Sequence, residues 1–492
     1  AGTFYGCAGL TGIKIPKSVT AIGNNAFSGC TNLASVHYTG SEVDWNLIDI
    51  GSSNEPLQNA VKTYDELPVP DYSGKCGDDL TWKRYKDGTL TIEGTGAMYD
   101  YGGDSNHTPW YYETDTIKTV RIEDGVTSIG NSAFGSCFYL ADVTIPSSVQ
   151  SIGQGAFEFD TALTSITIPE GVVSIGADAF QGSSLTSITL PSTVTSVGSS
   201  AFNGSGSLKN IEILGSITSM GMCAFQNCHK LTSVTIAEGT TVIGEAAFSG
   251  CDALPEIAIP KSVTSIGGRA FQLCAALTGV YISDMAAWCG IQFVDNESNP
   301  LSKAHNLYLN SELVNDLVIP EGVTSIGKNA FYGCTSLTSV TIPEGVTSIG
   351  EYAFDGCTSL TSVTIPEGVT SIGYSAFSGC SGMLSVTIPA SMTSIGDYTF
   401  YNCTALKNVY YSSCSKAKWN NITVGKSNDP LKNATMHYSD HQWDEGTITT
   451  PATCTTDGKK TYTCSACSKT KTETLEKLGH LFGEEEVIKP AT

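Results

Sequence analysis

Hydrophobic positions recur along this chain with a fixed period of 23 residues. The segment 337–359 reads LTSVTIPEGVTSIGEYAFDGCTS, and LTSVTIPEGVTSIG begins again at Leu360. A period of this length is typical of a stack of supersecondary units. One Phe marks each copy, and it lies 12 residues after an apolar residue that ends a strand-like run. These markers are Phe27, Phe134, Phe157, Phe180, Phe202, Phe225, Phe248, Phe271, Phe331, Phe354, Phe377 and Phe400.

Each copy predicts two extended pieces and a turn. The run 337–342 is rich in β-branched residues and predicts a short strand. Pro343 ends this strand because it cannot donate a ladder hydrogen bond. A second extended piece follows over 346–349, and the spacing of Phe354 and Cys357 predicts a turn of 3₁₀ or α helix.

A single copy cannot cover its own apolar side chains. Burying each of them is worth roughly 1.5–3 kcal/mol, but only when neighbouring copies lie above and below. The copies therefore predict a solenoid, with the 337–342 strand and its equivalents in one parallel sheet at about 4.8 Å spacing.

The repeated motif LxxVxIPxxVxxIGxxAFxxC resembles a known family. Over residues 1–36, about 117–282 and 317–411 it is similar to the BspA-like (Treponema-type) leucine-rich repeat of bacterial cell-surface proteins. The resemblance implies a curved, β-rich leucine-rich repeat solenoid, with short strands in a parallel sheet and short helical turns on the opposite arc. It also implies an extracellular or bacterial cell-surface location and a role in attachment or recognition.

The repeats divide the chain into seven parts. These are the end of a first array with an insert (1–70), an aromatic β-hairpin cap (71–116), a second array of seven copies (117–282), an insert (283–316), a third array of four copies (317–411), an insert (412–439), and a Cys/Thr-rich C-terminal module with a truncated second copy (440–492).

The three inserts are related to one another. Each carries a Trp (Trp45, Trp288 and Trp419), then a Gly/Ser/Asn loop, then Pro-Leu and a Tyr-bearing strand. In one interpretation the Trp covers the end of the apolar stack, as terminal repeats must. In the other, the three Trp side chains form an aromatic ledge for a ligand.

Composition narrows the choice of partners. The 492 residues carry a formal net charge of −22, which argues against nucleic acids and anionic membranes because phosphate binding needs a basic surface. No apolar run reaches the roughly 18 residues of a membrane helix, so no membrane insertion is expected. The partners expected are proteins or glycans of a host or matrix.

The 17 cysteines follow the repeat more than they follow a disulfide pattern. Ten of them stand three residues after the repeat's Phe, at a position that also accepts Asp160, Ser183 and Ser205. This predicts a row of buried, reduced thiols that act as small hydrophobic side chains. Disulfides between stacked copies are the alternative.

No catalytic constellation emerges from the sequence. The seven His residues lack metal-binding i, i+4 spacing around a carboxylate, and neither a nucleophile elbow nor a phosphate loop is present. The sequence therefore predicts a non-catalytic protein without a cofactor, and it sets no oligomeric state.

The concave face of the sheet offers candidate binding residues. Residues between the buried strand positions are mostly Ser and Thr, which suits a solvated face. The departures are Asp142, Asn210, Glu212, Glu256 and Tyr281 in the second array and Tyr410 at the end of the third. These departures favour adhesion or recognition, whereas the nearly identical third array favours a passive stalk that displays other modules.

The C-terminal module repeats with a period of 39. HQWDEGTITTPAT at His441 is echoed by HLFGEEEVIKPAT at His480, so we expect the natural protein to continue beyond Thr492 with a Cys. Four zinc ligands can come from Cys454, Cys464, Cys467 and either His441 or His480, because CxxC is the usual paired spacing. A disulfide between Cys454 and one Cys of the CxxC pair, and three reduced thiols, are the alternatives.

Overall fold

The computed structural model describes residues 2–40, 42–65, 70–102 and 106–479. It contains two compact units, one formed by Ala1–Gly74 with Lys83–Leu90 and the other by Lys75–Trp82 with Thr91–Thr492. The expected continuation of the second module copy, including His480 as a ligand, lies outside the described residues.

The first unit contains one complete coil, preceded by the arc of another, and a variant coil. Its strands and helices are β1 (Gly12–Ile15), β2 (Ala21–Ile22), β3 (Ser35–Tyr38), α1 (Glu42–Asn46), β4 (Asp49–Ile50), α2 (Glu55–Asn59) and β5 (Val61–Tyr64). β1, β3 and β5 form one parallel sheet, and β2 pairs in parallel with β4. Beyond them lie β6 (Tyr72–Lys75), β7 (Asp79–Arg84) and β8 (Thr89–Ala97). Within the segment expected to form a hairpin cap, the chain turns at Asp87-Gly88, where Tyr85 N–H donates to the Thr89 carbonyl at 2.8 Å.

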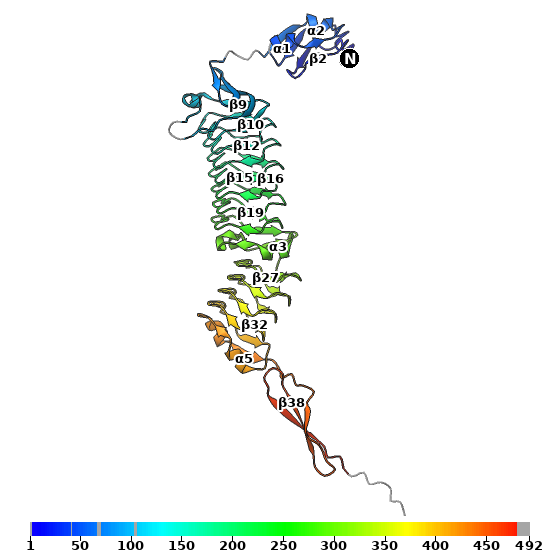
Figure 1. Cartoon of the computed structure of the whole chain (residues 1–492), viewed down its shortest axis with the longest axis vertical. Coiled ribbons are helices and arrows are strands. Elements are labelled where there is room, and N and C mark those ends of the chain that lie inside the picture. Colours follow the sequence, from blue (N-terminus) through cyan, green and yellow to red (C-terminus); the bar gives the residue numbers. More distant parts are fainter. Residues whose placement is uncertain (1, 41, 66–69, 103–105, 480–492) are drawn as a thin grey trace, which may run out of the picture. The chain divides into compact units, whose positions relative to one another are not determined.

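The second unit stacks the remaining repeats, coloured cyan to orange in Figure 1. Every copy except the one at 163–168 places its first extended piece in one row of strands, and every copy places its second extended piece in another row. For the second array and its insert, the first row is β9 (Thr119–Ile122), β11 (Asp142–Thr144), β14 (Ser187–Leu190), β16 (Asn210–Ile213), β18 (Ser233–Ile236), β20 (Glu256–Ala258), β22 (Gly279–Ile282) and β24 (Leu307–Leu309), to which β25 (Glu312–Leu313) adds antiparallel. The second row is β10 (Val126–Ile129), β12 (Ser151–Ile152), β13 (Ser174–Ile175), β15 (Ser196–Val197), β17 (Ser219–Met220), β19 (Val242–Ile243), β21 (Ser265–Ile266) and β23 (Gln292–Phe293). The copy at 163–168 has no strand in the first row.

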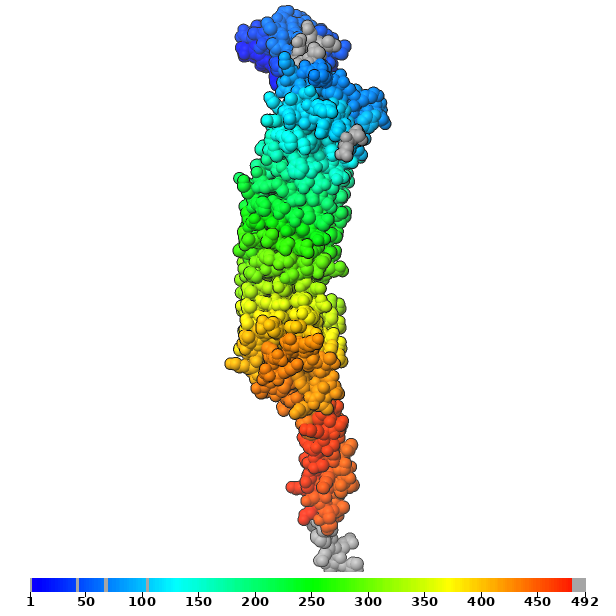
Figure 2. Space-filling view, turned by 90° about the vertical axis from the view of Figure 1, so that its left-hand side faces the viewer, coloured from blue at the N-terminus to red at the C-terminus, as the bar shows by residue number. Residues whose placement is uncertain are grey.

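The third array repeats this arrangement. Its first row is β26 (Asp316–Val318), β28 (Ser339–Thr341), β30 (Ser362–Thr364), β32 (Ser385–Ile388), β34 (Asn408–Tyr411) and β36 (Thr435–Tyr438), and its second row is β27 (Ser325–Ile326), β29 (Ser348–Ile349), β31 (Ser371–Ile372), β33 (Ser394–Ile395) and β35 (Thr423–Val424). Val340 faces Val363 in parallel register. The predicted parallel solenoid is therefore confirmed. The coils present a continuous surface on the face shown in Figure 2.

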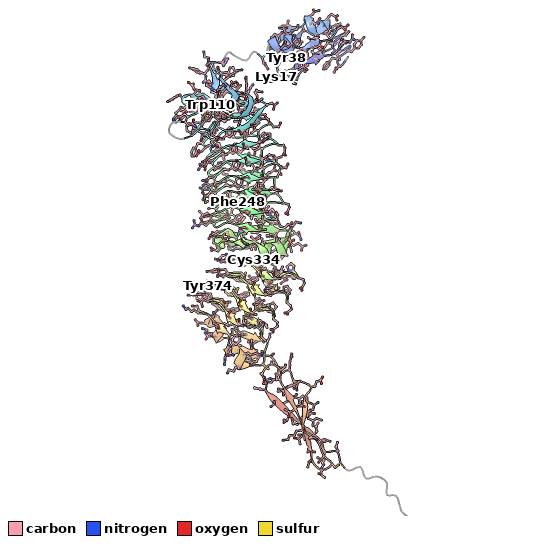
Figure 3. The ribbon with its side chains drawn as sticks, in the orientation of Figure 1. Lys17, Tyr38, Trp110, Phe248, Cys334 and Tyr374 are labelled. Atoms are coloured by element: carbon pink, nitrogen blue, oxygen red, sulfur yellow. The ribbon has the colours of Figure 1, made fainter. Side chains whose placement is uncertain are left out.

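Phenylalanine rings form the centre of both arrays. Neighbouring ring centroids lie 5.1–5.7 Å apart from Phe134 to Phe271 and 5.2–5.7 Å apart from Phe331 to Phe400. All of these side chains are fully buried, including Phe248, which Figure 3 labels in the interior of the stack. Each ring between the ends of an array is thus covered by the rings of the copies before and after it.

The arc that carries Phe consists of single hydrogen-bonded turns of the 3₁₀ type that was expected. Cys357 N–H donates to the Phe354 carbonyl at 3.2 Å, which is the i→i+3 bond of a 3₁₀ helix. Tyr352 (φ 57°) and Gly356 (φ 75°) adopt left-handed backbone, so no helix propagates. Phe354 N–H instead donates to the Ala376 carbonyl of the next coil at 2.8 Å. Alternate amides of the arc thus join neighbouring coils.

The position two residues before Phe is left-handed in all twelve copies that the Phe markers define, although its residue type varies. Besides Tyr352 the set is Asn25, Ser132, Gly155, Asp178, Ser200, Cys223, Ala246, Arg269, Asn329, Ser375 and Tyr398. Left-handed backbone is unfavourable for most of these residue types. The ladder between coils must offset that strain.

Nine of the ten repeat cysteines lie buried, as predicted, whereas Cys7 is exposed, and most of the buried thiols also donate hydrogen bonds. Seven thiols point at the Phe carbonyl of the preceding coil at 3.1–3.4 Å, from Cys30, Cys228, Cys251, Cys274, Cys357, Cys380 and Cys403. Where Ser205 replaces the Cys, its hydroxyl donates to the Phe180 carbonyl at 3.0 Å. This shared donor role explains why Ser substitutes for Cys. Burial raises the pKa of the Cys357 thiol well above its usual range.

The inserts are variant coils that contribute one strand to each row. Each insert carries two short helices, the first between its first-row and second-row strands and the second in place of the arc: α1 and α2, then α3 (Met285–Gly290) with α4 (Leu301–Ala304) after the 3₁₀ turn η2 (Asn296–Ser298), then α5 (Lys416–Asn420) and α6 (Asp429–Asn433). In the first and third inserts, Asn54 and Asn428 accept the N–H of Phe27 and Phe400 through Oδ1 at 2.8 and 2.9 Å. Each side chain thereby replaces the carbonyl that a following coil would supply.

The second insert connects the second array to the third and does not end the stack of coils. Asn299 Nδ2 donates to the Asn329 carbonyl of the third array at 2.7 Å. Trp288 Nε1 likewise donates to the Ala330 carbonyl at 2.9 Å. At the start of the second array, Trp110, which precedes the 3₁₀ helix η1 (Tyr111–Thr116), stacks on Phe134 and donates to the Ala133 carbonyl at 2.9 Å.

The C-terminal module has almost no interior. It is an antiparallel sheet of β37 (Thr447–Thr450), β38 (Gly458–Thr463) and β39 (Thr470–Leu475). Among described residues 440–479, Cys464 is the only buried apolar side chain. Packing of apolar side chains therefore contributes little to its stability.

Candidate recognition surface and cysteine cluster

The predicted surface residues lie on the outward side of the first strand row, which we call the strand face. Asn210 and Glu212 are both exposed on β16, and Glu212 accepts a hydrogen bond from Thr189 at 3.1 Å. Asp142 is exposed on β11, three coils away and so about 14 Å from Asn210 at the usual strand spacing. The strand face thus brings Asn210 and Glu212 together but leaves Asp142 apart.

Glu256 and Tyr281 form a tighter group at the end of the second array. Tyr281 hydrogen-bonds Glu256, and its ring stacks on Tyr308 with centroids 4.6 Å apart. Desolvation, followed by the charge and hydrogen bond of Glu256, raises the pKa of Tyr281. Sequence reasoning missed Tyr308 because it belongs to the insert, although its Tyr-bearing strand continues the same row.

A groove of about 290 Å³ opens beside Tyr281. Its lining is Ile236, Glu238, Ala258, Ile259, Pro260, Tyr281, Ile282, Ser283, Asn310 and Ser311. It combines an aromatic ring and apolar side chains with a carboxylate and an amide. These groups suit a sugar ring or a short peptide, which need a stacking surface and hydrogen-bond partners together.

The remaining predicted residues lie elsewhere. Tyr410 is exposed on β34 of the third array and stacks on His437 with centroids 4.7 Å apart. Trp45 and Trp288 are buried and Trp419 is half-buried. The two buried indoles fit the interpretation that the insert Trp covers the apolar stack, and they leave no shared aromatic ledge.

A row of tyrosines on the arc of the third array escaped sequence analysis. Tyr352, Tyr374, Tyr398 and Tyr401 follow one another with ring centroids 5.3–5.6 Å apart. Figure 3 labels Tyr374 at the edge of its coil. The signal was present in the sequence, because these tyrosines recur close to the repeat's Phe in consecutive copies.

This tyrosine row ends at a second groove, of about 300 Å³. Its lining is Val294, Asp295, Asn296, Lys328, Asn329, Tyr332, Tyr352 and Asp355. Burial raises the pKa of Asp355 to about 6, against a hydrogen bond from Ser378 that lowers it.

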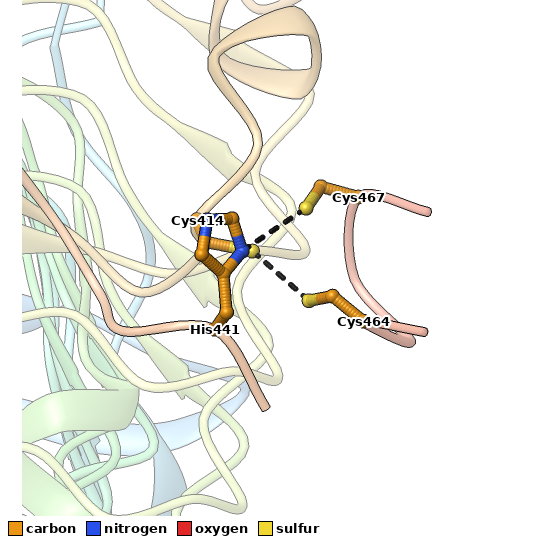
Figure 4. Close-up of side chains that lie close together, drawn as sticks. All are labelled: Cys414, His441, Cys464 and Cys467. Carbon is orange, nitrogen blue, oxygen red and sulfur yellow. Dashed lines mark hydrogen bonds between the residues drawn. The ribbon is translucent and has the colours of Figure 1, made fainter. Parts of the chain in front are cut away.

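Four candidate metal ligands converge where the third insert meets the C-terminal module (Figure 4). The ligand atoms of Cys414, His441, Cys464 and Cys467 all lie within 4.8 Å of one another. The Sγ atoms of Cys414 and Cys464 are 3.3 Å apart, and Cys467 Sγ lies 3.2 Å from His441 Nδ1. Three of the four residues were predicted as ligands, but Cys454 is exposed and outside the group, and Cys414 takes its place.

The repeats place the chain in a family. A sequence model of a protein family, described as BspA type leucine-rich repeat region, matches residues 1–52, 108–231, 173–287 and 304–428 of this chain. The chain belongs to the BspA-type leucine-rich repeat family. None of the curated proteins compared with this family member matches it.

The chain is also similar to solved structures of bacterial proteins at low sequence identity. A leucine-rich repeat protein from Bacteroides ovatus is 24% identical, with 74% of this chain and 99% of that chain covered and a TM-score of 0.47. A leucine-rich cell surface protein from Faecalibacterium prausnitzii is 24% identical, with coverages of 84% and 82% and a TM-score of 0.25. The pneumococcal vaccine antigen PcpA is 17% identical, with coverages of 74% and 98% and a TM-score of 0.36.

The described residues of this BspA-type chain contain no helix long and apolar enough to cross a membrane.

Proposed function

We propose that this BspA-type solenoid is a cell-surface or secreted recognition protein that binds host or matrix proteins or glycans without catalysis. One observation carries the proposal: the strand face departs from Ser and Thr at Glu256 and Tyr281, where the stacked ring of Tyr308 and a groove of about 290 Å³ adjoin them. The surface location rests on the resemblance of the repeat to that of bacterial cell-surface proteins.

The chemistry of this site selects the kind of partner. The half-buried rings of Tyr281 and Tyr308 provide stacking area, and Glu256, Glu238 and Asn310 provide hydrogen-bonding groups. The formal charge of −22 disfavours acidic ligands, since like charges repel at the surface. Neutral glycans and neutral or basic protein segments fit best.

A binding screen with a matched variant tests the proposal. The purified chain is screened against extracellular-matrix proteins and a glycan array, alongside the triple variant Asn210→Ser, Glu212→Thr, Tyr281→Thr. These changes restore the row's own consensus, so the fold is expected to persist. We expect the strongest ligand to lose at least tenfold in affinity, as a hot spot costs about 2 kcal/mol or more.

Two controls separate the site from general surface effects. Glu321→Thr removes an exposed carboxylate from a turn, and Tyr139→Thr removes an exposed tyrosine from another coil. Neither should change binding. Equal losses from these controls and the triple variant would refute the assigned site.

The alternative function is a passive stalk that displays other modules. The third array favours it, because the same small polar residue recurs at one position of consecutive strands, at Ser339, Ser362 and Ser385. A stalk predicts that no ligand in the screen distinguishes the parent chain from the triple variant.

A further inference from the structure

We propose that Cys414, His441, Cys464 and Cys467 form a structural zinc site that fastens the C-terminal module to the last insert of the solenoid. This site is independent of what the strand face binds.

The ligands belong to two parts of the chain. Cys414 lies between β34 and α5 of the third insert, whereas His441, Cys464 and Cys467 belong to the module. Cys464 follows β38, and Cys467 lies in the turn before β39.

The donor set selects the metal. Three thiolates and one imidazole are soft and borderline ligands, which suit zinc and exclude magnesium and calcium. Four protein ligands leave no open position, which is the arrangement of structural rather than catalytic zinc. Binding displaces the thiol protons to solvent, and the neutral imidazole nitrogen donates its lone pair to the metal.

A disulfide explains less of this geometry. The sulfurs of Cys414 and Cys464 are 3.3 Å apart, well beyond the roughly 2.05 Å of an S–S bond. In tetrahedral zinc sites with Zn–S near 2.3 Å, sulfurs stand about 3.8 Å apart. A bond between two of the residues would also leave the convergence of His441 and Cys467 unexplained.

The third insert differs from the others at this point. In each insert a short segment leads from the end of the first-row strand to the Trp. In the third insert this segment is 411–419 and contains Cys414, whereas the equivalent segments 38–45 and 282–288 contain no cysteine. The one insert followed by the Cys-rich module is thus the one that supplies a thiol here.

The module also needs a source of stability other than apolar packing. Cys464 is the only buried apolar side chain among its described residues. Small domains that lack a core depend on metals or disulfides for their stability. A zinc ion at this position would supply what packing does not.

The test uses the full chain, purified under reducing conditions and stripped with a chelator. Zinc is titrated by calorimetry, and cobalt(II) serves as a spectroscopic probe of tetrahedral thiolate ligation. We expect one metal ion per chain and thiolate-to-cobalt charge-transfer absorption. Cys467→Ser and Cys414→Ser should each weaken zinc binding by more than the 10–100-fold typical of changes outside the ligand shell.

Cys454→Ser is the matched control, because Cys454 is an exposed cysteine of the same module outside the cluster. It should bind zinc like the parent chain. Limited proteolysis gives a second readout: zinc should protect 440–479 in the parent and Cys454→Ser chains but not in Cys467→Ser.

Three results would overturn the site. One is a reduced parent chain that binds no zinc. Another is a loss of zinc in Cys454→Ser as large as in Cys414→Ser. The third is a native Cys414–Cys464 disulfide in a protein that fails to bind zinc after reduction.

Discussion

The coils of the solenoid and the C-terminal module are both built from short β-strands, yet their interiors are opposites. In the coils, Phe354 is fully buried between the rings of Phe331 and Phe377. In the module, Ile448 is 62% exposed on β37, and hardly any apolar side chain is covered. Two regions with similar secondary structure therefore depend on different sources of stability.

This difference in burial shows that the repetition of the coils is what covers their apolar side chains. A coil buries its apolar side chains because the next copy presents the same side chains in the same register. The module has too few apolar residues to do this alone. Substitutions should therefore be felt strongly in the coils and weakly on the module sheet.

The largest effect is expected for Phe354→Ala, which should lower the free energy of unfolding by about 3–5 kcal/mol, as for other buried Phe residues. Chemical denaturation measures it, and hydrogen exchange should show the adjacent coils opening first. Ile448→Ala on the module should change stability by no more than about 0.5 kcal/mol. Equal effects at the two positions would contradict the comparison.

Trp110→Phe tests the start of the Phe stack. The Phe ring can still cover Phe134, but the Ala133 carbonyl loses its indole donor. We expect a loss of about 1–3 kcal/mol, the cost of an unsatisfied buried polar group. Tyr112→Phe, at a side chain that is 92% exposed, is the control and should leave stability unchanged.

Asp160→Asn should raise stability in a pH-dependent way. Asp160 is fully buried, Oδ1 accepts from Cys137 N–H at 2.8 Å, and Oδ2 has no hydrogen-bond partner among the described residues. Burial raises the pKa of this carboxyl well above its usual range, against the lowering effect of that hydrogen bond. The contribution of this carboxyl to the free energy of unfolding is therefore most favourable below the unfolded pKa of about 3.9, and it is lost as pH rises through the folded pKa.

At neutral pH the Asp160→Asn variant should be more stable by about 1–3 kcal/mol, the penalty of an unsatisfied buried group, and the gain should vanish towards acid. Thermal denaturation from pH 3.5 to 8 measures this trend. Asp142→Asn, at an exposed position, should show no such trend. A gain at Asp160 that is independent of pH would refute the electrostatic explanation.

The smallest effect concerns the left-handed position of the arc. Ala246 has φ 51°, so Ala246→Gly should raise stability by up to about 1 kcal/mol through relief of strain. The neighbouring Ala247 is buried with ordinary backbone, so Ala247→Gly should lower stability by about 1 kcal/mol. The same sign for both changes would contradict the strain argument.

Much of the fold could be predicted because the signal repeats. The spacing from Ile342 to Phe354 recurs twelve times, so chance matches average out and the parallel register follows. The left-handed position of the arc could not be predicted, because Tyr352 and Ala246 share a conformation and no chemistry. A Ser-Ile-Thr-Ile run at 165–168 resembles its neighbours but forms no strand, which spacing alone cannot reveal.

Sites that occur once were harder to predict than repeated ones. His441, Cys464 and Cys467 could be grouped because they are close in sequence and type. Cys414 lies 50 residues from Cys464, and only the packing of the third insert against the module brings them together. Tyr308 was missed for the same reason, since its partner Tyr281 precedes the insert.

The asparagines of the first and third inserts bear on how such chains grow longer. Asn54 and Asn428 accept the amide hydrogen of a Phe that every coil presents in the same place. A gene segment encoding one more coil can therefore be duplicated ahead of either insert without any compensating change in the insert itself. The same insert can therefore end an array of any length. In each case the Phe amide of the last coil is paired with the Asn side chain and is not available to pair with another chain.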